Sequence, residues 1–222
     1  MVERNFSKVV TRVRFSSPAP KVTEVTINVH KIIKTKNMLE IIKERVATFN
    51  RALNEILEIK YVGDPILRQQ TEHVELLEGV TIGDQLGQVL LRYREVAGFG
   101  RGLAAPQIGL NKAVFVTFVD SKLQTFINPK IVDKAQETNF YKELCLSSGI
   151  MVADVERPEW VVMEWMDIDG VKHKEKIEGF LARCYQHEET HLRAIVNLDE
   201  VAPQGIEFAT FDPLKEQLRK TR

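Results

Sequence analysis

The chain is poor in cysteine, with only two in 222 residues, which excludes a disulfide framework and favours a reducing cytoplasm. It carries no net charge, because 31 Lys and Arg residues balance 31 Asp and Glu residues, so we expect neither nucleic acid nor a membrane surface as a partner. It also lacks an apolar run long enough to span a bilayer. Hydrophobic residues make up 44% of the sequence, enough for one sizeable core.

The most informative stretch is His-Glu-Glu-Thr-His at residues 187–191. The residues before it, 180–186, contain neither glycine nor proline, so the stretch is predicted to be helical. On a helix, His187 and His191 lie on one face and can bind a single divalent metal ion. Glu188 is then placed to exchange a proton with a water molecule on that metal. The alternative interpretation of this pattern is an exposed polar helix face.

A metal site of this kind needs a third protein ligand, and several residues compete for the position. Cys184 lies about one turn before His187 on nearly the same helix face, although a thiol there is more often a small apolar wall residue. Cys145 lies in a segment remote from the helix. Metal sites generally combine a pair of ligands on a helix with a third ligand from a separate strand or loop. Acidic residues downstream of the helix would instead complete a zinc peptidase site; they are Asp199, Glu200 and Glu207.

Three segments, in this order and spacing, resemble the motifs of the peptide deformylase family. The family motifs are Gly-x-Gly-Leu-Ala-Ala-x-Gln, Glu-Gly-Cys-Leu-Ser and Gln-His-Glu-x-Asp-His-Leu, and their counterparts here are residues 100–107, 143–147 and 186–192. Two shorter matches are residues 63–68 and 127–129. The resemblance covers about residues 58–210 and favours Cys145 as the third ligand.

The resemblance implies a set of site residues. Cys145, His187 and His191 would bind the metal, with Fe²⁺ as the native ion and Zn²⁺, Ni²⁺ or Co²⁺ as substitutes. Ligand chemistry alone favours zinc. Catalysis would depend on the Glu188 carboxylate as proton carrier, and on the Gln107 amide and the Leu146 backbone N–H as oxyanion donors. The expected substrate-binding residues are Gly100, Arg101, Gly102, Leu144, Arg183 and Cys184.

We therefore predict an enzyme of bacterial type that removes the formyl group from N-formylmethionyl nascent peptides and releases formate. We expect a cytoplasmic monomer, with the ribosome near its tunnel exit as a further candidate partner. Two other functions stay open at this point. One is a zinc endopeptidase in which Cys145 is dispensable, and the other is a binding protein with this fold and little or no turnover.

Three positions depart from the family motifs. Leu144 replaces the glycine before the cysteine, Thr190 replaces the aspartate between the histidines, and Ala194 replaces a glycine just beyond them. If the family glycine has φ > 0, a leucine there would cost about 1–2 kcal/mol, but we expect Leu144 to be extended. The aspartate is a candidate outer partner of the metal ligands, and the loss of such a partner matters about 10–100-fold.

The expected fold is α+β, with mixed or antiparallel sheets packed around the central metal-binding helix. The sequence predicts helices at residues 39–59 and 81–97, with an apolar stripe on the second and Gly98 as its C-cap. It predicts a strand at residues 113–119 and a hairpin at residues 160–177 with its turn at Asp169-Gly170. Asp212 and Pro213 are typical of the start of a short terminal helix.

The N-terminal segment differs from the rest of the chain. Residues 1–37 contain eight Lys and Arg residues and a Ser-Ser-Pro-Ala-Pro stretch, and we assign the catalytic domain to residues 38–222. Three interpretations of the segment stay open: a disordered extension, an organelle-targeting presequence, and translation from a start codon assigned upstream of Met38.

Overall fold

The computed structural model describes residues 37–210 and 219–220. The basic extension predicted at residues 1–37 lies outside this range except for Asn37, and so does the helix predicted to begin at Asp212 and Pro213. Within the described residues, no helix is both long and apolar enough to cross a membrane.

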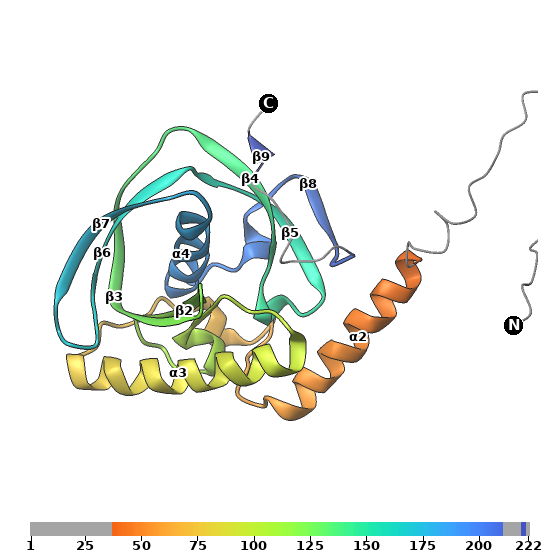
Figure 1. Ribbon diagram of the computed structural model, residues 1–222, viewed down its shortest axis with the longest axis horizontal. Coiled ribbons are helices and arrows are strands. Elements are labelled where there is room, and N and C mark those ends of the chain that lie inside the picture. Colours follow the sequence, from red (N-terminus) through yellow and green to blue (C-terminus); the bar gives the residue numbers. More distant parts are fainter. Residues whose placement is uncertain (1–36, 211–218, 221–222) are drawn as a thin grey trace, which may run out of the picture. The chain divides into compact units, whose positions relative to one another are not determined.

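Helices and strands both contribute to the described chain (Figure 1). The α-helices are α2 (Met38–Glu55), α3 (Leu76–Ala97) and α4 (Gly179–Leu192). The strands are β1 (Gly102–Ala104), β2 (Val114–Val119), β3 (Lys122–Lys134), β4 (Thr138–Leu144), β5 (Met151–Pro158), β6 (Trp160–Met166), β7 (Lys172–Glu178), β8 (Val201–Phe208) and β9 (Arg219–Lys220). Single 3-10 turns are η1 (Pro65–Arg68), η2 (Ala105–Ile108), η3 (Leu146–Ser148) and η4 (Asn197–Asp199).

The strands form two antiparallel sheets, one in the order β1-β2-β3-β6-β7 and the other in the order β8-β5-β4-β9. The predicted hairpin is present, with Trp160 opposite Glu178 and Met166 opposite Lys172. Figure 1 shows the strands curving around α4, with α3 running along one side. The expected α+β fold around a central metal-binding helix is confirmed, and each of these strand pairs is antiparallel.

Helix α3 begins at Leu76, five residues before the predicted start at Thr81. Five residues of its predicted apolar stripe are buried, and the sixth, Ala97, is half-buried; the buried five are Ile82, Leu86, Val89, Leu90 and Tyr93. Gly98 caps the helix with a φ of 78°, the left-handed conformation in which glycine is favoured. The stripe and the cap were both correctly predicted from the sequence.

A second face of α3 carries glycine at every fourth residue, and its close packing against a strand was not predicted from the sequence. A Cβ added to Gly83 would lie 2.4 Å from Thr125, and one added to Gly79 would lie 2.7 Å from Ile127. Both neighbours belong to β3, so the helix backbone packs directly against the sheet. This contact fixes β3, to which β2 and then β1 are hydrogen-bonded in turn.

Helix α2 starts at Met38 as predicted but ends at Glu55, before the expected end near Ile59. The backbone beyond it bonds to distant segments instead. The Lys60 N–H donates to the Gln107 carbonyl at 2.8 Å, and the Val62 N–H donates to the Ser147 carbonyl at 2.9 Å. These long-range bonds replace further helical bonds, and sequence periodicity gives no sign of them.

Backbone strain falls on Ala194 and not on Leu144. Ala194 has a φ of 66°, whereas Leu144 pairs with Val152 as an ordinary strand residue, as expected. We predict that Ala194→Gly raises the free energy of unfolding by about 0.5–1 kcal/mol, because the left-handed strain relieved exceeds the entropy that glycine adds to the unfolded chain. Thermal unfolding measures the change. Ala47→Gly, in the exposed interior of α2, is the control and should lower the melting temperature. A fall in both variants would contradict the strain at Ala194.

Candidate metal centre

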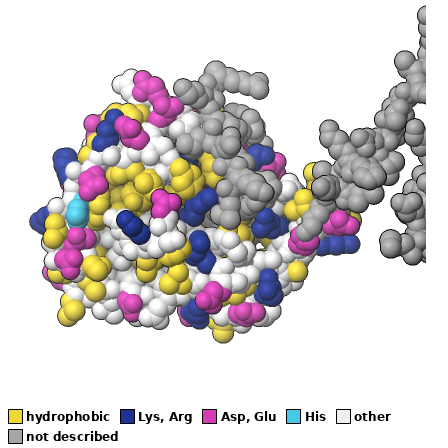
Figure 2. Space-filling view, viewed as in Figure 1, with side chains coloured by type: hydrophobic (Ala, Val, Ile, Leu, Met, Phe, Trp, Pro, Cys, Tyr) yellow, Lys and Arg dark blue, Asp and Glu magenta, His cyan; other side chains and the backbone are white. Residues whose placement is uncertain are grey.

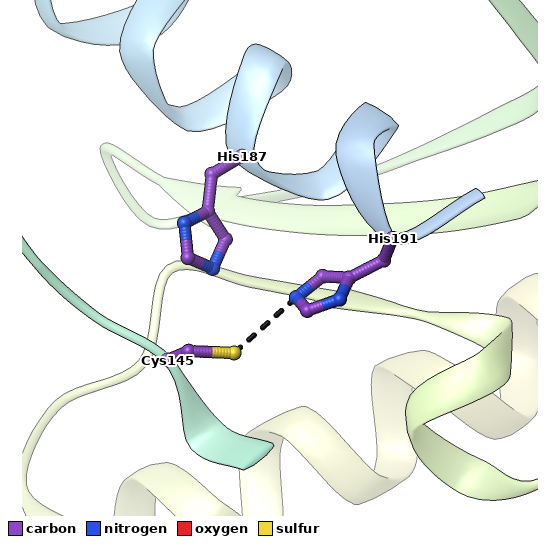
Figure 3. Close-up of side chains that lie close together, drawn as sticks. All are labelled: Cys145, His187 and His191. Carbon is purple, nitrogen blue, oxygen red and sulfur yellow. Dashed lines mark hydrogen bonds between the residues drawn. The ribbon is translucent and has the colours of Figure 1, made fainter. Parts of the chain in front are cut away.

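The two histidines of the predicted motif lie on α4, and their rings face the same space. The ring centroids of His187 and His191 are 5.2 Å apart. Cys145 follows β4 and is the N-cap residue of the turn η3, so it comes from a separate segment as expected. Its Sγ lies 3.2 Å from Nε2 of His191 (Figure 3). The ligand atoms of the three side chains all lie within 4.8 Å of one another, which a single metal ion requires.

The other candidates for the third ligand do not join this cluster. Cys184 is buried in a pocket wall, and burial raises the pKa of its thiol, as expected for an inert structural cysteine. The three downstream acids form ion pairs elsewhere: Asp199 with Arg68, Glu200 with Arg157, and Glu207 with Lys142. Among the described residues, only the Cys-His-His group has metal-binding geometry.

Glu143 is the first residue of the cysteine motif at residues 143–147, but its contact with a metal ligand was not predicted. Its carboxylate is buried and accepts from Nδ1 of His187 at 2.7 Å, which orients the ring and leaves Nε2 toward Cys145. It also accepts two hydrogen bonds from Arg157, at 2.8 and 2.9 Å. Burial opposes ionisation of Glu143, but the Arg157 charge outweighs it and holds the carboxyl pKa well below its usual value.

The sequence carries a weak signal for this network, because burial alternates along β4 and two of its buried positions hold the polar residues Asn139 and Glu143. Arg183 belongs to the same network. Its guanidinium donates to Glu143 at 3.0 Å and to the Asn139 carbonyl at 2.7 Å. Arg183, a predicted substrate-binding residue, lines the pocket, and its side chain also holds Glu143 in place.

The Glu188 carboxylate lies beside the cluster and is 5% exposed. Burial raises its pKa to about 7. A Cβ added to Gly102 would lie 2.2 Å from Oε1 of Glu188, so the glycine of β1 leaves the space that this carboxylate fills. A carboxyl group with a pKa near neutrality can both accept and release a proton at neutral pH.

Gln107 is fully buried beside the cysteine. Its Nε2 donates to Sγ of Cys145 at 3.4 Å and to Oγ of Ser147 at 3.1 Å. Its Oε1 accepts from the Ala104 N–H at 2.8 Å, which fixes the amide orientation. The glycine-rich segment and the cysteine segment, distant in sequence, thus meet at the metal cluster.

A pocket opens onto the cluster, and all six residues predicted to bind substrate line it: Gly100, Arg101, Gly102, Leu144, Arg183 and Cys184. Five lining residues were not predicted as site residues: Phe99, Tyr141, Lys142, Glu143 and Phe180. The Arg101 guanidinium lies over the Phe180 ring, 4.4 Å from its centroid. Figure 2 shows hydrophobic side chains gathered near the middle of one face, with Lys and Arg side chains beside them.

The hydrogen bonds around residue 190 differ between the two histidines. The Thr190 hydroxyl donates to the His187 carbonyl at 2.8 Å and so makes a local bond within α4. Nδ1 of His191 is buried and has no hydrogen-bond partner. His187 therefore has a fixed orientation through Glu143, whereas His191 lacks a comparable partner.

The antiparallel sheets, the His-Glu-x-x-His helix and the cysteine from another segment together define a metal-dependent hydrolase. The model of the polypeptide deformylase family matches residues 56–206. The chain belongs to the peptide deformylase family, and its activity is that of a peptide deformylase. The resemblance identified from the motifs is confirmed.

Similar proteins support this assignment in sequence and in structure. A peptide deformylase of Pseudothermotoga lettingae is 35% identical over 167 residues, covering 75% of this chain and 95% of that protein. The crystal structure of a peptide deformylase from Synechococcus elongatus in complex with actinonin is 36% identical, with a TM-score of 0.57, and the match covers 66% of this chain and 79% of that one. The peptide deformylase of Thermotoga maritima is 30% identical, with a TM-score of 0.59, covering 65% and 97% of the two chains.

Proposed function

We propose that the protein removes the formyl group from N-formylmethionyl nascent peptides and releases formate. The observation that supports this best is the buried Glu188 carboxylate, held against Gly102 beside the Cys145, His187 and His191 cluster. The donor set fits a divalent metal, because the ligand atoms converge and Glu143 already orients one imidazole. A metal bound there would supply Lewis-acid chemistry.

Glu188 moves the proton in this proposal. It takes a proton from the attacking water and delivers it to the amine as the formyl C–N bond breaks. The Gln107 amide and the Leu146 N–H bind the oxyanion of the formyl carbonyl. Their positions support these roles: Gln107 lies against Cys145, and Leu146 begins η3, whose first N–H groups have no partner within the turn.

The substrate enters through the pocket. We propose that the methionine side chain packs between Cys184 and the wall formed by Gly100, Leu144 and Arg183. Arg101 and Phe180 lie farther out, where both are half-buried, so they would contact residues that follow methionine. The mixture of apolar walls and few polar groups is typical of a site for a small apolar side chain.

The metal and the setting complete the proposal. We propose Fe²⁺ as the native ion, with Zn²⁺, Ni²⁺ or Co²⁺ able to replace it, because one thiolate and two imidazoles suit each of these ions. We further propose a cytoplasmic monomer that meets its substrates near the ribosomal tunnel exit. Cys145 forms no disulfide bond, and a cysteine that must stay reduced to bind a metal is compatible with a reducing compartment.

Formate release from a formyl-Met peptide tests the function. Protein purified without oxygen and analysed for metal should release one formate per peptide, and the unformylated peptide should not be cleaved. Cleavage of an internal peptide bond without formate release would instead support an endopeptidase. Metal analysis of the same preparation separates lack of metal from lack of activity.

Leu144 offers a second test within the site. Because Leu144 is an extended strand residue, Leu144→Gly relieves no strain, and we expect it to lower the free energy of unfolding by up to about 1 kcal/mol through the unfolded chain. We also expect kcat/KM for the formyl-Met peptide to change more than stability does, since residue 144 lines the pocket. Denaturant unfolding and steady-state kinetics measure the two effects. A marked gain in stability would contradict the extended conformation.

A further inference from the structure

Helix α2 ends just before residues 56–206, the part of the chain that the family model matches, yet it packs against the catalytic site. Phe49 provides the main contact. A Cβ added to Gly149 would lie 2.9 Å from Cζ of Phe49, so the ring packs directly on the glycine backbone. Gly149 follows η3, four residues after Cys145, and has a φ of 64°. The ring therefore packs against Gly149 at the C-terminal end of the turn that follows the cysteine of the metal cluster.

That turn is short and held by several hydrogen bonds, so a displacement of its last residues would also displace Cys145. The Ser148 N–H donates to the Cys145 carbonyl at 3.1 Å, and the Ser148 hydroxyl donates to the same carbonyl at 3.0 Å. The Cys145 N–H in turn donates to Oγ of Ser148 at 3.3 Å. Phe49 also makes an edge contact with Tyr61, with ring centroids 5.3 Å apart. The ring therefore contacts both Tyr61 and the end of the cysteine turn.

A second contact of α2 involves a residue that lines the pocket. The Arg45 guanidinium lies 5.4 Å from the centroid of the Phe99 ring, and Phe99 lines the pocket. Arg51 donates to the carbonyl of Val96 at 3.1 Å, near the end of α3. One helix thus contacts both a pocket-lining residue and the end of the turn that follows Cys145.

We propose that α2 is a positioning element of this active site and that Phe49 is its positioning residue. The Phe49 ring holds the cysteine turn in the geometry that keeps Sγ of Cys145 beside His191 and keeps Leu146 next to the substrate. Part of the proposal rests on the proposed role of Cys145 as metal ligand. The experiment therefore includes the metal content and activity of the unchanged protein, which test that role separately.

The experiment compares Phe49→Ala with Leu53→Ala in the full chain. Leu53 lies one turn further along the same helix and is 37% exposed, whereas Phe49 is half-buried, so Leu53 is a matched apolar control with less packing to lose. Both proteins are loaded with Co²⁺, and the rate of metal release to a chelator, the thiolate-to-cobalt absorption band, kcat and KM are measured. We expect Phe49→Ala to release metal about tenfold faster, to shift the absorption band and to lose about tenfold in kcat. Effects of about this size are typical when a residue that orients a metal ligand is lost. Leu53→Ala should stay within about twofold of the unchanged protein in all of these.

Rescue distinguishes positioning from general destabilisation. Phe49→Leu, which keeps an apolar side chain over Gly149, should recover most of the metal retention and the absorption band. If Phe49→Ala does not fold, Phe49→Val, which leaves part of the space over Gly149 empty, takes its place in the comparison. Equal effects of Phe49→Ala and Leu53→Ala, whether both large or both absent, would overturn the proposal. If the wild-type protein bound its metal through residues other than Cys145, His187 and His191, the proposed function would be overturned instead.

Discussion

Glu188→Gln is expected to keep its metal and lose about 10²–10⁴-fold in kcat. Glutamine keeps the shape that fills the space beside Gly102, but its neutral amide does not accept the proton from the attacking water. Metal content and kcat therefore separate in this variant. Elemental analysis and formate release measured on the same sample check both quantities.

Glu189→Gln is the matched control for that experiment. Glu189 is the next residue of the same helix, but its carboxylate pairs with Arg193 and not with the metal cluster. We expect kcat within about threefold of the unchanged protein. A Glu188→Gln variant with the activity of this control would exclude Glu188 as the proton carrier.

The pH profile follows from the same carboxylate. Glu188 accepts a proton only when ionised, so kcat/KM should fall as pH falls through its pKa, which burial raises to about 7. The positive charge of a bound metal favours the ionised form, so the acid limb should lie at or below this value. Glu188→Gln should lose the limb in its residual activity. A limb that survives unchanged would have to come from another group.

Cys145→Ser is expected to abolish stable metal binding. The variant removes one of the three converging ligand atoms, so the loss should exceed the 10–100-fold that is typical of an outer partner. Cys184→Ser should keep the metal, because the Cys184 thiol lies in the pocket wall outside the cluster. Equilibrium dialysis against Co²⁺ or Zn²⁺ measures the affinities. Equal metal loss in the two variants would contradict the assignment of Cys145.

The sequence determined the features that depend on local spacing. The helical spacing placed His187 and His191 on one face, and the separate cysteine segment made Cys145 the third ligand once the family motifs were matched. The apolar stripe of α3, its Gly98 cap and the β6–β7 hairpin were also predictable, because each depends on residues close together in the chain. These local signals were sufficient for the fold class and the family.

Only the tertiary structure decided which distant residues act on the site. Glu143 of β4 accepts hydrogen bonds from both His187 of α4 and Arg157 of β5, and no sequence spacing relates these three residues. The left-handed strain lies at Ala194, where the chain turns away after α4, while Leu144 stays extended through its pairing with β5. The contact of Phe49 with Gly149 joins segments 100 residues apart. Periodicity and motifs describe neighbours along the chain, whereas these contacts depend on how separate elements approach one another.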